Sequence, residues 1–195
     1  MNEKGSVATP FNDCYATLEW VVNHAKELSI DPDSIGVGGD SAGGNLAAGV
    51  AIKARDTGDV NLAFQLLIYP CNDNEMNYDS AYNNATGYGL STQAMKWFWE
   101  QYLQGNSHDK NPYAVPAAAK DFSNLAPAII TTAEFDPLID DGYIYAELLR
   151  KSGVSTVYRE YEGMIHGYFT LAGITPEANV LHQHVADEIN ALLAR

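Results

Sequence analysis

The chain has 195 residues, of which 46% are apolar and 18% are charged. This balance is typical of a globular protein, and the length suffices for one substantial core, so we expect a single domain over residues 1–195. Its 25 acidic and 11 basic side chains give a formal net charge of −14. Nucleic acids and anionic membranes bind clustered Lys and Arg, so the charge argues against both partners.

No apolar run is long enough to cross a membrane, since the longest candidate, residues 62–70, is interrupted by Gln65. The first five residues contain no stretch of signal-peptide type. Cys14 and Cys71 are too few for a disulfide framework, and we expect buried reduced thiols. The sequence therefore predicts a cytoplasmic protein, in which the glycosylation sequon at residues 84–86 has no meaning.

The N-terminal part of the chain alternates helix and strand. Apolar residues at steps of three and four predict an amphipathic helix over residues 12–29, and an Asp-Pro-Asp turn follows. A short strand over residues 34–38 leads through a glycine-rich segment into an alanine-rich helix over residues 45–55. Residues 62–69 form a nearly continuous apolar run, which is typical of a strand buried on both faces.

The middle of the chain is more polar. Residues 72–88 are rich in Asn, Asp and Tyr and predict a loop. Residues 91–103 predict a helix with apolar side chains on one side, which Ser91 or Thr92 can cap. We expect residues 72–125 to form a loop-and-helix insertion near the substrate pocket.

The C-terminal part returns to regular alternation. Strands are expected over residues 127–133 and 155–161, and the helix between them covers residues 140–152 and stops at Gly153. A final helix begins at Thr175-Pro176, because proline is favoured in the first helical turn. The alternation predicts an α/β fold with a mostly parallel sheet of about four strands flanked by helices.

The glycine-rich segment after the first strand is the most informative part of the sequence. A dinucleotide fingerprint counted from Gly36 requires glycine at its sixth position, where Ser41 stands. A phosphate-binding loop counted from Gly38 requires lysine after Gly43, where Gly44 stands. Both phosphate-binding hypotheses fail on residue identity, and we expect no cofactor.

The same segment matches the pattern G-x-S-x-G at Gly39, Ser41 and Gly43. A serine on a sharp strand-to-helix turn adopts a strained backbone that lifts its hydroxyl above the sheet, and small neighbours let the turn close. The amide of Ala42 and the helix dipole then favour negative charge beside it. The pattern predicts that Ser41 is a nucleophile, and the alternative is a glycine-rich tight turn.

A serine nucleophile needs a base and an acid that orients the base. In α/β-hydrolases these follow in the order Ser, Asp or Glu, His, on loops after later strands. Asp136 and His166 follow the third and fourth expected strands in this order. Glu134 and Asp140 are rival acids, but Glu134 lies close to the strand and Asp140 is better placed to cap a helix.

The other histidines suggest no metal site. His24 lies in an expected helix and His108 in a polar loop. His182 and His184 are two positions apart on a helix, so they point to different sides and do not form a chelating pair. We therefore expect no bound metal.

Several motifs in order carry a resemblance to the bacterial hormone-sensitive-lipase-like (family IV) esterases. The principal motifs are residues 39–45, 134–138 and 162–167, with further matches at 10–15, 97–102 and 111–113. The resemblance covers residues 10–195. It implies hydrolysis of small, short-chain carboxylic esters by a triad of Ser41, Asp136 and His166, with the Ala42 amide in the oxyanion hole.

The family also has an N-terminal part with early strands, capping helices and a His-Gly-Gly-Gly loop, and this chain begins inside that part. The loop supplies oxyanion-hole amides, and one lost donor costs about 2.7–4 kcal/mol. We therefore expect a weak esterase. The alternative is a catalytically impaired fragment or interaction module that needs an N-terminal partner.

The missing strands have a second consequence, because the strand over residues 34–38 becomes a sheet edge. Unpaired backbone groups and uncovered apolar faces favour association, so we expect a homo-oligomer through this edge.

The pocket residues are less well defined by the sequence. Asp40, beside Ser41, and Tyr168 and Phe169, near His166, are candidates. Ordinary core packing explains the two aromatic residues equally well. Amidase or thioesterase specificity stays open, because the same triad serves these reactions.

Overall fold

A computed structural model describes residues 8–106 and 108–194. Its centre is a sheet of four strands in the order β1-β2-β3-β4, and every neighbouring pair is parallel. The strands are β1 (Val37–Asp40), β2 (Gln65–Ile68), β3 (Ala128–Phe135) and β4 (Thr156–Ile165). The predicted α/β fold with a parallel sheet is therefore confirmed.

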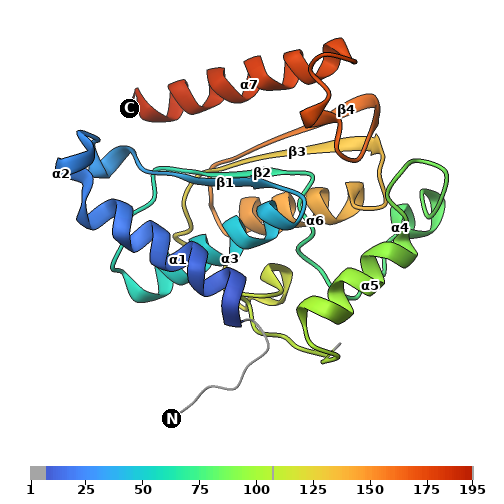
Figure 1. The fold of residues 1–195 in the computed structure, drawn as a ribbon, viewed down its shortest axis with the longest axis horizontal. Coiled ribbons are helices and arrows are strands. Elements are labelled where there is room, and N and C mark those ends of the chain that lie inside the picture. Colours follow the sequence, from blue (N-terminus) through green and yellow to red (C-terminus); the bar gives the residue numbers. More distant parts are fainter. Residues whose placement is uncertain (1–7, 107, 195) are drawn as a thin grey trace.

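Seven helices surround this sheet in the described residues (Figure 1). They are α1 (Ala8–Asn23), α2 (Ala25–Leu28), α3 (Ala42–Thr57), α4 (Asp79–Asn83), α5 (Thr92–Tyr102), α6 (Ile139–Lys151) and α7 (Pro176–Leu193). Helices α3 and α6 pack on one face of the sheet, α1 packs on α3, and α7 lies on the other face.

Both faces of the sheet bury apolar side chains. The face toward α3 and α6 packs Ile52, Leu67, Ile130, Tyr145 and Leu149. The face toward α7 packs Ile68, Tyr69, Tyr161, Tyr168 and Leu181. Burial on both sides explains why the β2 segment reads as a continuous apolar run rather than as an alternating pattern.

The N-terminal boundaries differ from those expected. The helix expected over residues 12–29 begins earlier and is interrupted at His24, and it ends at Ser29 in a left-handed conformation. Strand β1 begins later than residue 34, because Pro32–Ser34 form a 3-10 turn that the Asp31 side chain caps.

The middle of the chain also departs from the prediction. The expected loop over residues 72–88 contains the short helix α4, and Pro116–Ala118 form a further 3-10 turn. The helix expected over residues 91–103 is α5, and the Ser91 hydroxyl oxygen accepts a hydrogen bond from the Ala94 N–H.

Strands β3 and β4 are longer than predicted and end at Phe135 and Ile165. Pairing between them continues past an irregularity at Ala133. Because of this extension, Asp136 and His166 each stand directly after the end of a strand.

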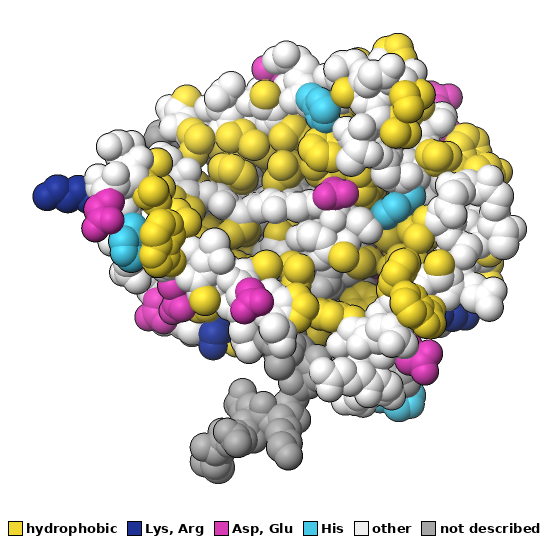
Figure 2. All heavy atoms as spheres, viewed as in Figure 1, with side chains coloured by type: hydrophobic (Ala, Val, Ile, Leu, Met, Phe, Trp, Pro, Cys, Tyr) yellow, Lys and Arg dark blue, Asp and Glu magenta, His cyan; other side chains and the backbone are white. Residues whose placement is uncertain are grey.

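Strand β1 forms the edge of the sheet, and no described strand pairs with its outer side. Figure 2 shows hydrophobic side chains exposed on this side of the molecule, between α7 and the sheet. None of the helices in the described part of the chain is long and apolar enough to cross a membrane.

Candidate active site

Ser41 lies in the turn between β1 and α3. Its backbone has φ 53° and ψ −118°, a conformation that is strained for any residue with a side chain. The Ser41 N–H donates to the Ile68 carbonyl oxygen at 2.9 Å, which fixes the turn against β2. A Cβ on Gly39 would lie 2.4 Å from the Gly43 carbonyl carbon, whereas a Cβ on Gly43 would meet open space. Tight packing of the turn therefore explains the first glycine of the pattern and not the last.

Asp136 is completely buried at the carboxyl end of β3. Its Oδ1 accepts a hydrogen bond from the Leu138 N–H at 2.9 Å. The Asn84 side-chain amide, just past α4, donates to the carbonyl oxygens of Glu134 and Asp136, both at 3.1 Å. The Leu138 N–H thus orients the carboxylate, and Asn84 fixes the backbone that carries it.

His166 connects the carboxylate to the serine. Its Nδ1 lies 2.6 Å from Asp136 Oδ2, and its Nε2 lies 2.9 Å from Ser41 Oγ. A carboxylate only accepts hydrogen bonds, so a neutral His166 carries its proton on Nδ1 and accepts the serine hydroxyl at Nε2. The structure brings the three predicted residues into one hydrogen-bonded chain.

The two rival acids are occupied elsewhere. Glu134 Oε2 accepts the Gly163 N–H at 2.7 Å, and Asp140 Oδ2 accepts the Ser80 N–H at 2.8 Å. Glu134 therefore ties β3 to the segment that leads to His166, and Asp140 ties α6 to α4.

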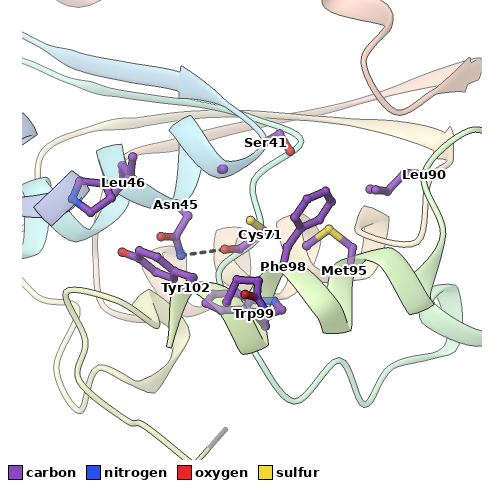
Figure 3. Close-up of a pocket in the computed structure, with 12 residues that line it drawn as sticks. Ser41, Asn45, Leu46, Cys71, Leu90, Met95, Phe98, Trp99 and Tyr102 are labelled. Atoms are coloured by element: carbon purple, nitrogen blue, oxygen red, sulfur yellow. Dashed lines mark hydrogen bonds between the residues drawn. The ribbon is translucent and has the colours of Figure 1, made fainter. Parts of the chain in front are cut away.

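A cavity of about 530 Å³ opens beside Ser41, and its lining is almost entirely apolar. Figure 3 shows the α5 side chains facing Ser41 and Cys71 across this space. The lining residues are Pro10, Ser41, Ala42, Asn45, Leu46, Cys71, Leu90, Met95, Phe98, Trp99, Gln101 and Tyr102. The Asn45 amide donates to the carbonyl oxygens of Cys71 and Ala114, so it connects the cavity floor to neighbouring loops.

The three predicted pocket residues are not among those lining this cavity. Tyr168 is 1% exposed and packs beside Tyr161 and Tyr69 under α7, and Phe169 contacts the His182 ring. Asp40 Oδ2 accepts a weak hydrogen bond from the Tyr69 hydroxyl. The expectation that Tyr168 and Phe169 line the pocket is not met, because the chain turns toward α7 after β4. These two aromatic residues therefore pack in the core under α7.

The sequence predicts that residues 72–125, which include α5, lie near the substrate pocket, but it does not identify which α5 side chains line the cavity. Met95, Phe98 and Tyr102 share the apolar side of the expected helix, which was a usable signal. An apolar helix side packs on a core or lines a cavity with the same periodicity, and only the tertiary arrangement distinguishes the two.

The remaining titratable groups form no cluster of three or more metal-ligating side chains within the described ranges. His182 and His184 on α7 contact the Phe169 carbonyl oxygen and the Tyr161 hydroxyl, respectively. Cys71 is buried, and burial raises the pKa of its thiol. Cys14 is exposed, contrary to expectation, because it lies in an open groove between α1, β1 and α3.

The site combines a strained serine on a strand-to-helix turn with an aspartate and a histidine that follow later strands of a parallel sheet. This combination defines the α/β-hydrolase class. Residues 5–170 match a family model described as the α/β hydrolase fold. The chain belongs to this family, among the hormone-sensitive-lipase-like esterases.

Curated relatives agree with this assignment. The chain is 42% identical over 170 residues to carboxylesterase NlhH of Mycobacterium tuberculosis, covering 86% of this chain and 53% of that protein. It is 35% identical over 161 residues to an arylesterase of Saccharolobus solfataricus, covering 82% and 52%. The chain thus spans about half the length of these relatives.

Solved structures show the same relation. A thermostable carboxylesterase cloned from a metagenomic library, EstE1, is 37% identical with a TM-score of 0.90, covering 95% of this chain and 64% of that one. A thermostable esterase of Pseudomonas putida is 37% identical with a TM-score of 0.91, covering 95% and 60%.

Proposed function

We propose that this chain hydrolyses short-chain carboxylic esters through an acyl-enzyme on Ser41. The single observation that supports this most strongly is the hydrogen-bonded chain from Ser41 through His166 to Asp136 beside an apolar cavity. Similarity to proteins named carboxylesterase, arylesterase and ethyl acetate hydrolase supports the same reaction class.

In the acylation step, Ser41 Oγ attacks the ester carbonyl carbon as His166 Nε2 takes the hydroxyl proton. Asp136 keeps the proton on Nδ1 and stabilises the positive imidazolium. The bond to the alcohol oxygen then breaks, and His166 returns the proton to the leaving alcohol. The acyl group remains on Ser41 as an ester.

In the deacylation step, a water molecule replaces the alcohol. His166 Nε2 takes a proton from this water as its oxygen attacks the acyl carbon. The bond to Ser41 Oγ breaks, His166 gives the proton back to the serine, and the carboxylic acid leaves.

The transition state carries negative charge on the former carbonyl oxygen. Ala42 begins α3, and its N–H and the helix N-terminus favour that charge. The chain contains no His-Gly-Gly-Gly sequence that would add further amides. Loss of one such donor lowers turnover by roughly 10²–10³-fold, so we expect slow catalysis by this chain alone.

The cavity indicates that the ester carries an apolar group. Aromatic and aliphatic side chains of α5 surround a space of about 530 Å³ that begins at Ser41. An apolar acyl or alcohol group enters such a space favourably, whereas a charged group loses its hydration without a partner. Uncharged short-chain esters are therefore the proposed substrates.

The test is hydrolysis of p-nitrophenyl butyrate by the purified chain and by the Ser41→Ala variant. We expect slow turnover by the parent chain and none above background by the variant. A fluorophosphonate probe should label the parent chain at Ser41 and leave the variant unlabelled. Equal hydrolysis rates without labelling would contradict the proposal and favour a fragment that needs a partner.

A further inference from the structure

Tyr69 follows β2 directly and is completely buried, yet neither the triad nor the cavity lining includes it. Its φ of 36° is unusual for a residue other than glycine. Its N–H donates to the Thr131 carbonyl oxygen at 2.6 Å, so β3 fixes the backbone at this point. A strained non-glycine residue persists only where its surroundings hold it firmly, and such residues cluster at functional sites.

The Tyr69 side chain lies between the serine turn and the histidine segment. Its ring centroid is 4.5 Å from that of His166, with an angle of 51° between the two planes. Its hydroxyl lies 3.4 Å from Asp40 Oδ2, next to Ser41. Burial raises the pKa of the Tyr69 phenol far above its usual value, with the neighbouring Asp40 carboxylate adding to this, so the hydroxyl stays a donor.

The two hydrogen bonds of His166 alone leave its ring free to rotate about one axis. Asp136 holds Nδ1 and Ser41 holds Nε2, on opposite sides of the imidazole. Rotation about the line that joins these two contacts tilts the ring and bends both hydrogen bonds. An aromatic ring packed against the imidazole opposes that rotation.

We propose that Tyr69 is a positioning residue, whose ring fixes the tilt of the His166 imidazole relative to Ser41. Its hydroxyl joins the same unit to Asp40 on the other side of the nucleophile. Its effect on turnover rests on the proposed esterase function, whereas its effect on the ring of His166 does not.

The kinetic test compares Tyr69→Leu with Tyr69→Phe, using p-nitrophenyl butyrate. Leu removes the aromatic face, and Phe keeps the face while removing the hydroxyl. We expect Leu to lower kcat by roughly 10–100-fold with little change in KM, since small misplacements of a catalytic group have costs of this size. Phe should restore kcat to within about threefold of the parent value, because the ring is what positions His166.

A spectroscopic test does not need turnover. An imidazole Nδ1 proton shared with a carboxylate gives a far-downfield proton NMR signal, which the His166→Gln variant should lose. We expect the signal in the parent chain and in Tyr69→Phe, and a broadened or absent signal in Tyr69→Leu. If Leu does not fold, Tyr69→Met, which is also flexible and non-aromatic, takes its place.

The outcomes separate the two proposals. A parent chain without Ser41-dependent turnover would contradict the esterase function, while loss of the signal in Leu alone would still support the role of Tyr69. A kcat and an NMR signal in Tyr69→Leu equal to those of the parent chain would overturn that role. A loss of kcat or signal in Tyr69→Phe as large as that in Tyr69→Leu would also overturn it, because the aromatic ring would then not be the group that positions His166.

Discussion

Gly39 and Gly43 hold matching places in the sequence pattern around Ser41, but the structure treats them differently. A side chain on Gly39 would collide with the backbone of Gly43 at 2.4 Å, and backbone atoms cannot move aside as a flexible side chain can. Gly43 lies in the first turn of α3 and faces open space. The turn therefore depends on one of these glycines and merely tolerates the other.

We expect Gly39→Ala to lower the melting temperature and to abolish fluorophosphonate labelling, because Ser41 must move to relieve the collision. Gly43→Ala is the matched control. It should raise the free energy of unfolding by about 0.5–1 kcal/mol, since alanine is favoured over glycine inside a helix. Thermal melts of both variants provide the measurement, and equal melting temperatures would contradict this account of the turn.

At the scale of elements, α4 and the end of β3 are joined through Asn84. In the sequence, Asn84 begins a glycosylation sequon. In the structure, its side-chain amide donates hydrogen bonds to the carbonyl oxygens of Glu134 and Asp136. Asn84 thereby links the segment after β2 to the loop that carries the acid.

We expect Asn84→Ala to cost about 1–3 kcal/mol of stability, because two partly buried carbonyl oxygens lose their donor. Turnover should fall as well, since the Asp136 loop gains freedom. Asn83→Ala, at the exposed neighbouring position of α4, is the control and should leave both unchanged. Urea unfolding and p-nitrophenyl butyrate hydrolysis measure the two effects. Equal losses in the two variants would show that the bonds of Asn84 are not the cause.

A second link between elements is the buried carboxyl of Asp141 on α6. Its Oδ2 accepts the N–H groups of Asn72 and Asp73 at 2.8 and 3.1 Å. Burial nevertheless raises the pKa of Asp141 well above its usual value, and the two amide donors offset only part of this.

This shift predicts a pH-dependent stability. The pKa of an aspartate is about 3.9 in the unfolded chain and higher for Asp141 in the folded chain. Between these two values the folded chain binds more protons than the unfolded chain. The stabilising contribution of Asp141 is therefore lost as the pH rises. Asp141→Asn removes that loss. The unfolding free energy of the variant relative to the parent should therefore increase from acidic to neutral pH, as urea titrations at several pH values would show. A difference that does not change with pH would contradict the prediction.

At the scale of the whole molecule, no strand in the described part of the chain pairs with the outer side of β1, and apolar side chains lie exposed near it (Figure 2). Such an edge can pair with another chain, and a second copy presents the same unpaired groups. The net charge of −14 opposes this association, and salt screens the repulsion.

We expect a dimer or larger assembly in sedimentation velocity at micromolar concentration, with more association at high salt. Screening should weaken the repulsion between copies and leave the apolar contact intact. A monodisperse monomer at both salt concentrations would refute this expectation.

Local patterns in the sequence were sufficient for the parallel α/β fold and for the order of Ser41, Asp136 and His166. Strand-to-helix turns and buried apolar runs depend on neighbouring residues, so they can be recognised without a structure. The strand ends were less predictable. Strand pairing carries β3 and β4 beyond their apolar runs, to Phe135 and Ile165.

Only the tertiary structure decided which acid faces His166 and which side chains line the cavity. Glu134 and Asp136 are two positions apart, and their different partners depend on segments that are distant in the sequence. The same holds for the ring of Tyr69 against His166 and for α5 beside Ser41. Contacts between distant segments follow from how the helices and strands pack, and packing has no local signature that a sequence pattern can reveal.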